Sequence, residues 1–231
     1  MPPDLSVVVP FYDEEAAAFA VVDELCRSMA ARGGAWEVIL VEDGSRDGTA
    51  LELERVRAAW PQCRVLRMGR NQGQGGALLA GIRAAQAPII AMMDGDGQNV
   101  PEDLAFLLPL LAGADLVVGM RTARHDSWLR RRISRFANAV RGRLLGDRLS
   151  DAGCALKVFR REVADVFFPL RMLNPFMPAI AVGAGFRVAE FPVRHRDRRS
   201  GRSKYGLRAM AFRPLADLFT VWRINRSRAA R

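Results

Sequence analysis

The sequence predicts an α/β fold with a mainly parallel β-sheet flanked by helices on both faces. Three observations lead to it: strand-like and helix-like segments alternate through the first 120 residues, the strand-like runs are short and apolar, and the 231-residue chain is 50% hydrophobic. Alternation of this kind places successive strands parallel, because each crossover runs through a helix. One domain with an appendage is the natural expectation for this length.

Each strand prediction rests on a short apolar run that ends in Gly, Pro or acidic residues. The run Leu5 to Pro10, rich in valine, is the first of them, and Glu42-Asp43-Gly44-Ser45 ends the second. The expected strands cover residues 5–10, 36–41, 64–68, 89–93, 115–119, 155–159 and 187–193.

Helices are predicted where apolar residues recur at helical spacing, as in the segment before Gly33-Gly34. The expected helices cover residues 14–32, 49–60, 74–86 and 101–111, followed by an Arg-rich stretch over 125–146. Residues 205–223 form a basic amphipathic segment that Pro214 is expected to break into two helices. That tail has two readings, packing on the domain or lying in a membrane interface.

The cysteines and apolar runs restrict the class of protein. Cys26, Cys63 and Cys154 are widely spaced and odd in number, which predicts buried, reduced thiols in a cytosolic protein. No secretory signal is recognised at the start of the chain. The longest apolar runs fall far short of the roughly 18 residues that a membrane span requires.

Charge is divided unevenly along the chain. Residues 1–120 carry 9 Lys/Arg and 17 Asp/Glu, whereas residues 121–231 carry 26 and 8. The basic half predicts an anionic partner, such as a phosphorylated substrate, a phospholipid surface or a nucleic acid. Because no helix-turn-helix, RRM or zinc-finger pattern accompanies the arginines, nucleic acid is not the expected partner.

Acidic clusters follow three of the predicted strands. The most informative is Asp94-Gly95-Asp96-Gly97-Gln98, where alternate side chains of an extended chain point the same way, so Asp94, Asp96 and Gln98 are candidate ligands of Mg²⁺ or Mn²⁺. An EF-hand is excluded, because its sixth and twelfth positions would be Asn99 and Ala105. The remaining alternative is an acidic turn that binds nothing.

The sequence lacks several other motifs that would indicate a function. The first strand is followed by Pro10-Phe11-Tyr12 rather than a G-x-G-x-x-G turn, and the Gly73-Gln74-Gly75-Gly76 turn has Leu78 where a third glycine belongs. No P-loop is present, and neither His125 nor His195 stands in a nucleophile motif. A dinucleotide-binding protein and a triad hydrolase are therefore not expected.

Four segments, in order, resemble the family 2 glycosyltransferases of GT-A fold (nucleotide-diphospho-sugar transferases). They are Val-Val-Pro-Phe-Tyr-Asp-Glu (8–14), Val-Glu-Asp-Gly-Ser-Arg-Asp-Gly-Thr (41–49), Met-Asp-Gly-Asp-Gly-Gln (93–98) and Arg-x-x-Gly-x-Ser-Lys (198–204). Within this family the chain is most similar to the polyprenyl-phosphate branch, which includes dolichol-phosphate mannose synthase-like enzymes.

The resemblance implies inverting, metal-dependent transfer of a sugar from a nucleotide-diphosphate sugar to a polyprenyl phosphate, undecaprenyl or dolichyl. Catalytic roles are implied for Asp96, Arg121, Asp151 and Lys204, and Asp94, Asp96 and Gln98 would hold Mg²⁺ or Mn²⁺. The implied nucleotide-sugar contacts are Pro10, Tyr12, Glu14, Val41, Asp43, Asp94 and Gly95. The implied contacts to the acceptor phosphate are Arg131, Ser150, Arg202 and Lys204.

Because a phosphate monoester is largely deprotonated at pH 7, no general base is required, and Asp151 is expected to be structural or orienting. The implied domain covers residues 1–205, with a donor and metal half (1–120) and an acceptor half (121–205), before a tail at 206–231. The enzyme is expected in the cytoplasm, peripheral at the inner face of the plasma membrane. Alternatives are transfer to a sugar or glycolipid hydroxyl, with Asp151 as base, and a non-catalytic nucleotide-sugar or nucleic-acid binding protein.

Overall fold

The computed structural model describes residues 2–122, 141–197 and 207–229, with only the backbone described at 207–215 and 229. Seven strands form one sheet in the order β3-β2-β1-β4-β6-β5-β7. The strand bounds are β1 Leu5–Phe11, β2 Trp36–Glu42, β3 Cys63–Arg67, β4 Ile89–Met92, β5 Leu116–Arg121, β6 Lys157–Arg160 and β7 Val188–Val193. Among the strands of the described residues, only β6 runs antiparallel to its neighbours, so the expected mainly parallel sheet is confirmed.

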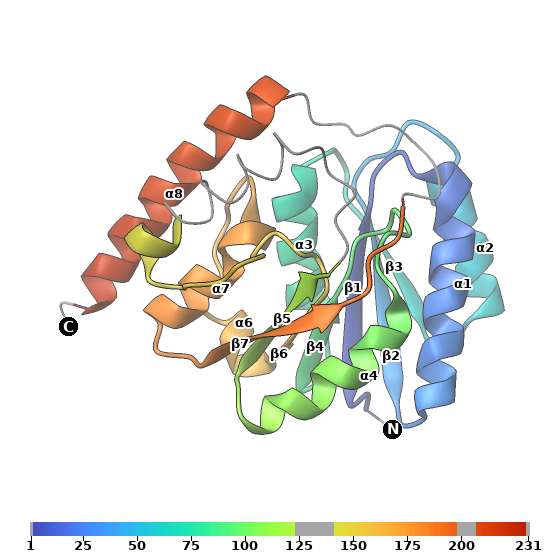
Figure 1. The fold of residues 1–231 in the computed structure, drawn as a ribbon. Helices are drawn as coiled ribbons and strands as arrows, with labels where there is room; N and C mark the ends of the chain where they lie inside the picture. The colour runs from blue at the N-terminus through green and yellow to red at the C-terminus, as the bar shows by residue number, and fades with distance from the viewer. Residues whose placement is uncertain (1, 123–140, 198–206, 230–231) are drawn as a thin grey trace.

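Helices cover both faces of this sheet (Figure 1). α1 packs with α2 and the segment before α4 on one face, while α3 packs on β1 and β2 and then against α7, which carries α8. The helix bounds are α1 Glu15–Arg32, α2 Thr49–Ala59, α3 Gly73–Ala84, η1 Pro101–Asp103, α4 Leu104–Leu107, η2 Leu108–Ala112, α6 Arg161–Ala164, α7 Leu173–Gly183 and α8 Leu207–Ala229. Every residue of β2 is buried, as two covered faces require.

Two helical predictions differ from the structure and one helix was not predicted, in each case at prolines. The helix expected over 101–111 is a series of short helical turns, with Pro101 and Pro109 near the starts of η1 and η2. α7 was not predicted, because Pro178 lies inside it. The expected break at Pro214 is wrong, since α8 continues through it. A proline inside a helix costs about 3 kcal/mol through a lost hydrogen bond and a clash with the preceding turn, and packing of the next turns on α7 offsets this cost.

One face of the second half of α8 packs against α7. The Asp217 carboxylate accepts the Met172 N–H at 2.8 Å, and the Asn225 amide donates to the Ala179 carbonyl at 2.8 Å. Val221 is fully buried between them, while Phe219 on the other side of the helix is 61% exposed. Among the described helices, none is both long and apolar enough to cross a bilayer.

Candidate active site

The acidic clusters meet at one edge of the sheet because β2, β1 and β4 are adjacent and parallel. Hydrogen bonds join the cluster after β1 (residues 10–14) to the cluster after β2 (residues 42–45). The Asp43 N–H donates to the Phe11 carbonyl at 2.9 Å, and the Asp13 N–H donates to Ser45 Oγ at 3.1 Å. Asp13 has φ +48°, a left-handed conformation that Asp and Asn tolerate. This edge is where parallel α/β sheets bind ligands.

Asp43 is held against the start of α3. Its Oδ1 accepts the Gln72 N–H at 2.7 Å, and its carbonyl accepts the Asn71 side-chain amide at 3.1 Å. Burial raises the pKa of Asp43, although backbone N–H donors from Gln72 and Gly73 oppose the shift. The carboxylate is therefore a buried acceptor whose position is fixed by these hydrogen bonds.

Asp94 and Asp96 lie in a turn, not in an extended strand. β4 ends at Met92, residues 95 and 96 form the turn, and Gly97 has φ +78°. The extended-chain argument for convergence was therefore wrong, and the turn itself brings the carboxylates together. Asp96 Oδ1 accepts the Gln98 N–H at 3.1 Å.

The two carboxylates repel each other. Burial first, and then the negative charge of Asp96, raise the pKa of Asp94 to about 6, against opposing effects of a Gln74 hydrogen bond, Lys157 and Arg121. A divalent cation at the pair would remove this repulsion. In the described residues no group of three or more His, Cys, Asp or Glu side chains is arranged to hold a metal. The described residues thus offer an aspartate pair, and carboxylate oxygens are ligands that suit Mg²⁺ or Mn²⁺.

Gln98 is hydrogen-bonded to the segment that follows β7. Its side-chain amide donates to the Arg196 carbonyl at 3.3 Å, and the Arg196 N–H donates to the Gln98 carbonyl at 2.9 Å. Asn99 and His195 form an isolated antiparallel bridge beside them. The nitrogen end of the Gln98 amide is therefore engaged, and only its oxygen is suited to a metal.

Gly95 is required by close packing. A Cβ at this position would lie 2.5 Å from Cε1 of Phe11 and 2.9 Å from the Pro10 carbonyl oxygen. Because the Phe11 ring is fully buried, it has little room to move. Gly95 thus lets the aspartate turn lie directly on the end of β1.

Gly95→Ala is expected to cost about 1–3 kcal/mol of the free energy of unfolding through overpacking. Chemical denaturation would measure it. Gly69→Ala is the matched control, because a Cβ at Gly69 meets nothing within 4 Å. Equal stability of the two variants would contradict the packing role of Gly95.

A second polar cluster lies at the same edge, at the end of β5 and before β6. Arg121 Nε and Nη2 each donate to Asp151 at 2.7 Å, and the Arg121 N–H donates to the same carboxylate at 3.2 Å. Asp151 is 4% exposed. Ser150 donates through its N–H and its hydroxyl to Glu190 of β7, both at 2.9 Å.

Lys157 is a fully buried lysine in β6. Its ammonium donates to the Cys154 carbonyl and to Oδ1 of Asn174, both uncharged acceptors. Burial lowers the pKa of Lys157 to about 8, while the charges of Asp94 and Asp151 act in the opposite direction. The ammonium therefore places a positive charge near both Asp94 and Asp151.

The depressed pKa of Lys157 predicts a pH dependence of stability. Between about pH 8 and 10.5 the unfolded chain binds the lysine proton that the folded protein has lost, so the free energy of unfolding rises with pH over that window. The expected gain is roughly 3 kcal/mol. A hydrogen bond with Cys63 and burial raise the pKa of the Cys26 thiol, and burial raises the pKa of the Cys154 thiol. These groups therefore lower the free energy of unfolding as pH rises, and the difference between the wild type and Lys157→Met isolates the lysine. Urea denaturation at pH 7.5 and 10 should show a change in the free energy of unfolding that is more favourable in the wild type than in Lys157→Met by roughly the expected gain; the same change in both proteins would contradict it.

The structure places most of the predicted site residues at the carboxyl ends of the strands, in two sets. Pro10, Tyr12, Glu14, Asp43, Asp94, Gly95, Asp96 and Gln98 lie at the ends of β1, β2 and β4, and Arg121, Ser150 and Asp151 at the end of β5 and before β6. Val41 does not reach the site surface, because its side chain is fully buried beside Gly81 of α3. Arg131, Arg202 and Lys204 lie outside the described residues.

Three residues near the site were missed. Gln74 at the start of α3 donates to Asp94 Oδ1 at 2.8 Å. In the sequence, the Gly73-Gln74 segment stands out only as an incomplete dinucleotide-binding motif. Lys157 gave no signal, because a lysine in a short strand usually points to solvent. Glu190 gave none either, since its partners are 39 and 40 residues away in the sequence.

The mainly parallel sheet, with an aspartate pair at the carboxyl ends of its strands and the Arg121–Asp151 ion pair beside it, is an α/β ligand-binding arrangement. The chain belongs to glycosyl transferase family 2, because the sequence model of that family matches residues 6–168. It is 36% identical to the dodecaprenyl-phosphate galacturonate synthase of Rhizobium johnstonii, over 98% of this chain and 68% of that protein. It is 35% identical to the undecaprenyl-phosphate 4-deoxy-4-formamido-L-arabinose transferase of Edwardsiella ictaluri, over 88% of this chain and 63% of that protein.

The chain thus spans roughly two thirds of the length of these relatives. Their names confirm the polyprenyl-phosphate branch that the four motifs predicted. The fold resembles glucosyl-3-phosphoglycerate synthase from Mycobacterium tuberculosis, crystallised with Mn²⁺, UDP-glucose and phosphoglyceric acid, at a TM-score of 0.72 and 20% identity over 95% of this chain and 80% of that one. That likeness confirms the expected GT-A architecture.

Proposed function

We propose that the protein transfers a sugar from a nucleotide-diphosphate sugar to a polyprenyl phosphate, with inversion and with a divalent cation. The observation that carries the proposal is the Asp94 and Asp96 pair at the exit of β4, with the Arg121–Asp151 clamp at the same edge of the sheet. The names of the relatives support the lipid phosphate as acceptor.

The donor would lie along the ends of β1, β2 and β4. Asp43 would accept hydrogen bonds from the base or ribose, and Pro10 and Tyr12 would form the adjoining wall. Asp94 and Asp96 would hold Mg²⁺ or Mn²⁺, which when bound would offset charge on the leaving diphosphate. Gln74 orients Asp94 for this task.

The acceptor phosphate would attack the anomeric carbon as the bond to the nucleotide diphosphate breaks, and the electron pair would leave with the diphosphate. A phosphate monoester has a second pKa of about 6, so its attacking oxygen is already anionic at pH 7. Both oxygens of Asp151 are engaged by Arg121, so Asp151 orients the arginine and is poorly disposed to act as a base. This geometry disfavours transfer to a neutral hydroxyl.

The decisive experiment supplies Mn²⁺, undecaprenyl phosphate and a panel of nucleotide sugars, with products identified by mass spectrometry. Undecaprenol, which lacks the phosphate, is the matched acceptor control. Product from the phosphate alone is expected. Product from undecaprenol, or from neither lipid with any sugar nucleotide, would overturn the proposal.

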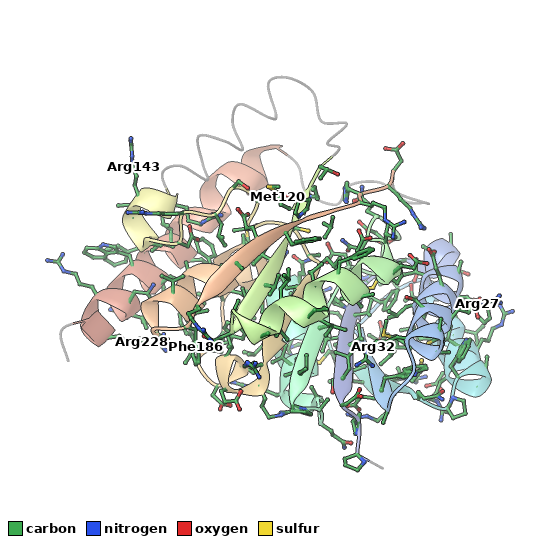
Figure 2. All side chains as sticks on the ribbon, turned by 60° about the horizontal axis from the view of Figure 1, so that its bottom comes forward. Arg27, Arg32, Met120, Arg143, Phe186 and Arg228 are labelled. Atoms are coloured by element: carbon green, nitrogen blue, oxygen red, sulfur yellow. The ribbon has the colours of Figure 1, made fainter. Side chains whose placement is uncertain are left out.

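The surface at the α8 end of the molecule would face the lipid. Figure 2 shows Arg143 and Arg228 at that end, remote from Arg27 and Arg32 on α1. Leu144 is 50% and Phe219 61% exposed. Exposed arginines beside exposed apolar side chains suit the interface of an anionic membrane, where the enzyme would bind peripherally.

This docking predicts a salt-sensitive affinity for vesicles. Arg223→Gln with Arg226→Gln is expected to weaken binding to phosphatidylglycerol vesicles roughly thirtyfold, because each arginine near the surface contributes about 1 kcal/mol. Sedimentation would measure it. Leu51→Ser is the control, since Leu51 is exposed on α2 at the other end of the molecule (Figure 1). Equal binding by all three proteins, or binding unaffected by salt, would refute the proposed surface.

A further inference from the structure

Glu190 of β7 gathers three hydrogen bonds from the turn that precedes β6. Its Oε2 accepts the Ser150 N–H and the Ser150 hydroxyl, both at 2.9 Å, and its Oε1 accepts the Asp151 N–H at 2.8 Å. Glu190 itself is fixed by the sheet, where it pairs in register with Val118 of β5. A rigid strand thus holds the backbone of a surface turn.

The Ser150–Asp151 turn also holds Arg121. Asp151 accepts three hydrogen bonds from Arg121, two from the guanidinium and one from the backbone N–H, and its side chain is 6% exposed. Arg121 is close enough to Asp94 for its charge to lower the pKa of that carboxylate. Hydrogen bonds therefore connect Glu190 of β7 to Arg121 through the Ser150–Asp151 turn.

These contacts also change the role of Ser150. Its hydroxyl and N–H are directed at a carboxylate, whereas a bound phosphate would need the same donors. Ser150 is thus part of the scaffold in this arrangement.

We propose that Glu190 is a positioning residue: it fixes the Ser150–Asp151 turn so that Asp151 holds Arg121 ready for the anionic groups of the substrates. This inference rests on the proposed transfer to a polyprenyl phosphate. Without the carboxylate, three donors lose their acceptor, the turn relaxes, and the guanidinium samples other positions.

The test compares Glu190→Gln with Glu190→Asp. Glu190→Gln replaces one of the two acceptor oxygens by an amide N–H₂, which cannot accept, and is expected to raise the KM for undecaprenyl phosphate about tenfold to a hundredfold, by analogy with the loss seen when outer hydrogen-bond partners of metal ligands are removed. Glu190→Asp keeps the charge and should recover part of that loss. Mn²⁺ affinity by calorimetry should stay unchanged, since Asp94 and Asp96 are untouched. Glu162→Gln, at an exposed position of α6, is the matched control.

A double-mutant cycle separates positioning from a general loss of structure. If Glu190 acts through Arg121, then Glu190→Gln in an Arg121→Gln background should produce little further loss. Losses that multiply would overturn the proposal. So would wild-type kinetics in Glu190→Gln, or tighter binding of undecaprenyl phosphate, which would make Glu190 a competitor for the phosphate site.

A second readout needs no substrate. Nitrogen NMR of the Arg121 Nε–H should show slow exchange with water in the wild type and in Glu162→Gln, and at least tenfold faster exchange in Glu190→Gln. If the wild type makes no polyprenyl product while this exchange accelerates, the proposed function fails and the positioning role stands. Unchanged exchange refutes the positioning role whatever the enzyme transfers.

Discussion

Asp96→Asn is expected to lower the rate of sugar transfer by about a thousandfold or more while leaving the fold intact. The asparagine Oδ1 still accepts the Gln98 N–H, so the turn keeps its geometry. The change removes one of the two charges that would hold the cation against the leaving diphosphate, and electrostatic stabilisation of that kind is a large part of catalysis.

The same variant has a second expected signature. Removing the negative charge beside Asp94 lowers the raised pKa of Asp94, so the metal-free protein should unfold at an equal or higher temperature than the wild type. Calorimetry should show that Mn²⁺ binding is lost. Asp115→Asn is the control, because Asp115 pairs with Arg187 at the opposite edge of the sheet. Wild-type transfer by Asp96→Asn, or transfer by the wild type in excess chelator, would contradict the metal role.

The elements of the first half of the fold could be predicted from the sequence, because local sequence signals and the tertiary structure agree there. Valine-rich runs became buried strands, and the acidic residues that end them met at one edge because parallel strands share their carboxyl ends. The position and direction of β6 in the sheet could not be predicted from local sequence signals. An antiparallel strand between two parallel ones depends on which neighbours it finds, and nothing in Lys157 to Arg160 encodes that.

Long-range contacts explain what sequence reasoning missed at the site. Asp94, Asp96 and Asp43 carry a local pattern, a carboxylate after an apolar run, and were found. Gln74 and Glu190 act only through partners far away in the sequence. Proline also misled: Pro178 and Pro214 are both helix breakers by propensity, yet both lie within helices that are held by the packing of α7 and α8.

The segment that leads into the Ser150–Asp151 turn is anchored by a buried ion pair. Arg141 Nε donates to Asp147 at 2.9 Å, and their side chains are 8% and 0% exposed. Arg141 also donates to the Leu149 carbonyl at 3.3 Å. The neighbouring Arg143 extends outward from the surface (Figure 2), so the two arginines of this helical turn serve different purposes.

Arg141→Met is expected to cost about 3–5 kcal/mol of the free energy of unfolding, because it leaves the Asp147 carboxylate buried without its cation. Urea denaturation would measure the loss. Arg143→Met is the matched control and should lie within about 0.5 kcal/mol of the wild type, as exposed substitutions usually do. A comparable loss in both variants would contradict the buried pair as the cause.

The double variant Arg141→Met with Asp147→Leu distinguishes an uncompensated charge from a general loss of packing. Replacing both members of a buried pair by apolar residues is often neutral, so most of the stability should return. Transfer activity should return with it, since the turn at Ser150 and Asp151 would again be anchored. A double variant as unstable as Arg141→Met alone would mean that the arginine contributes through its other contacts, such as the Leu149 carbonyl, rather than through Asp147.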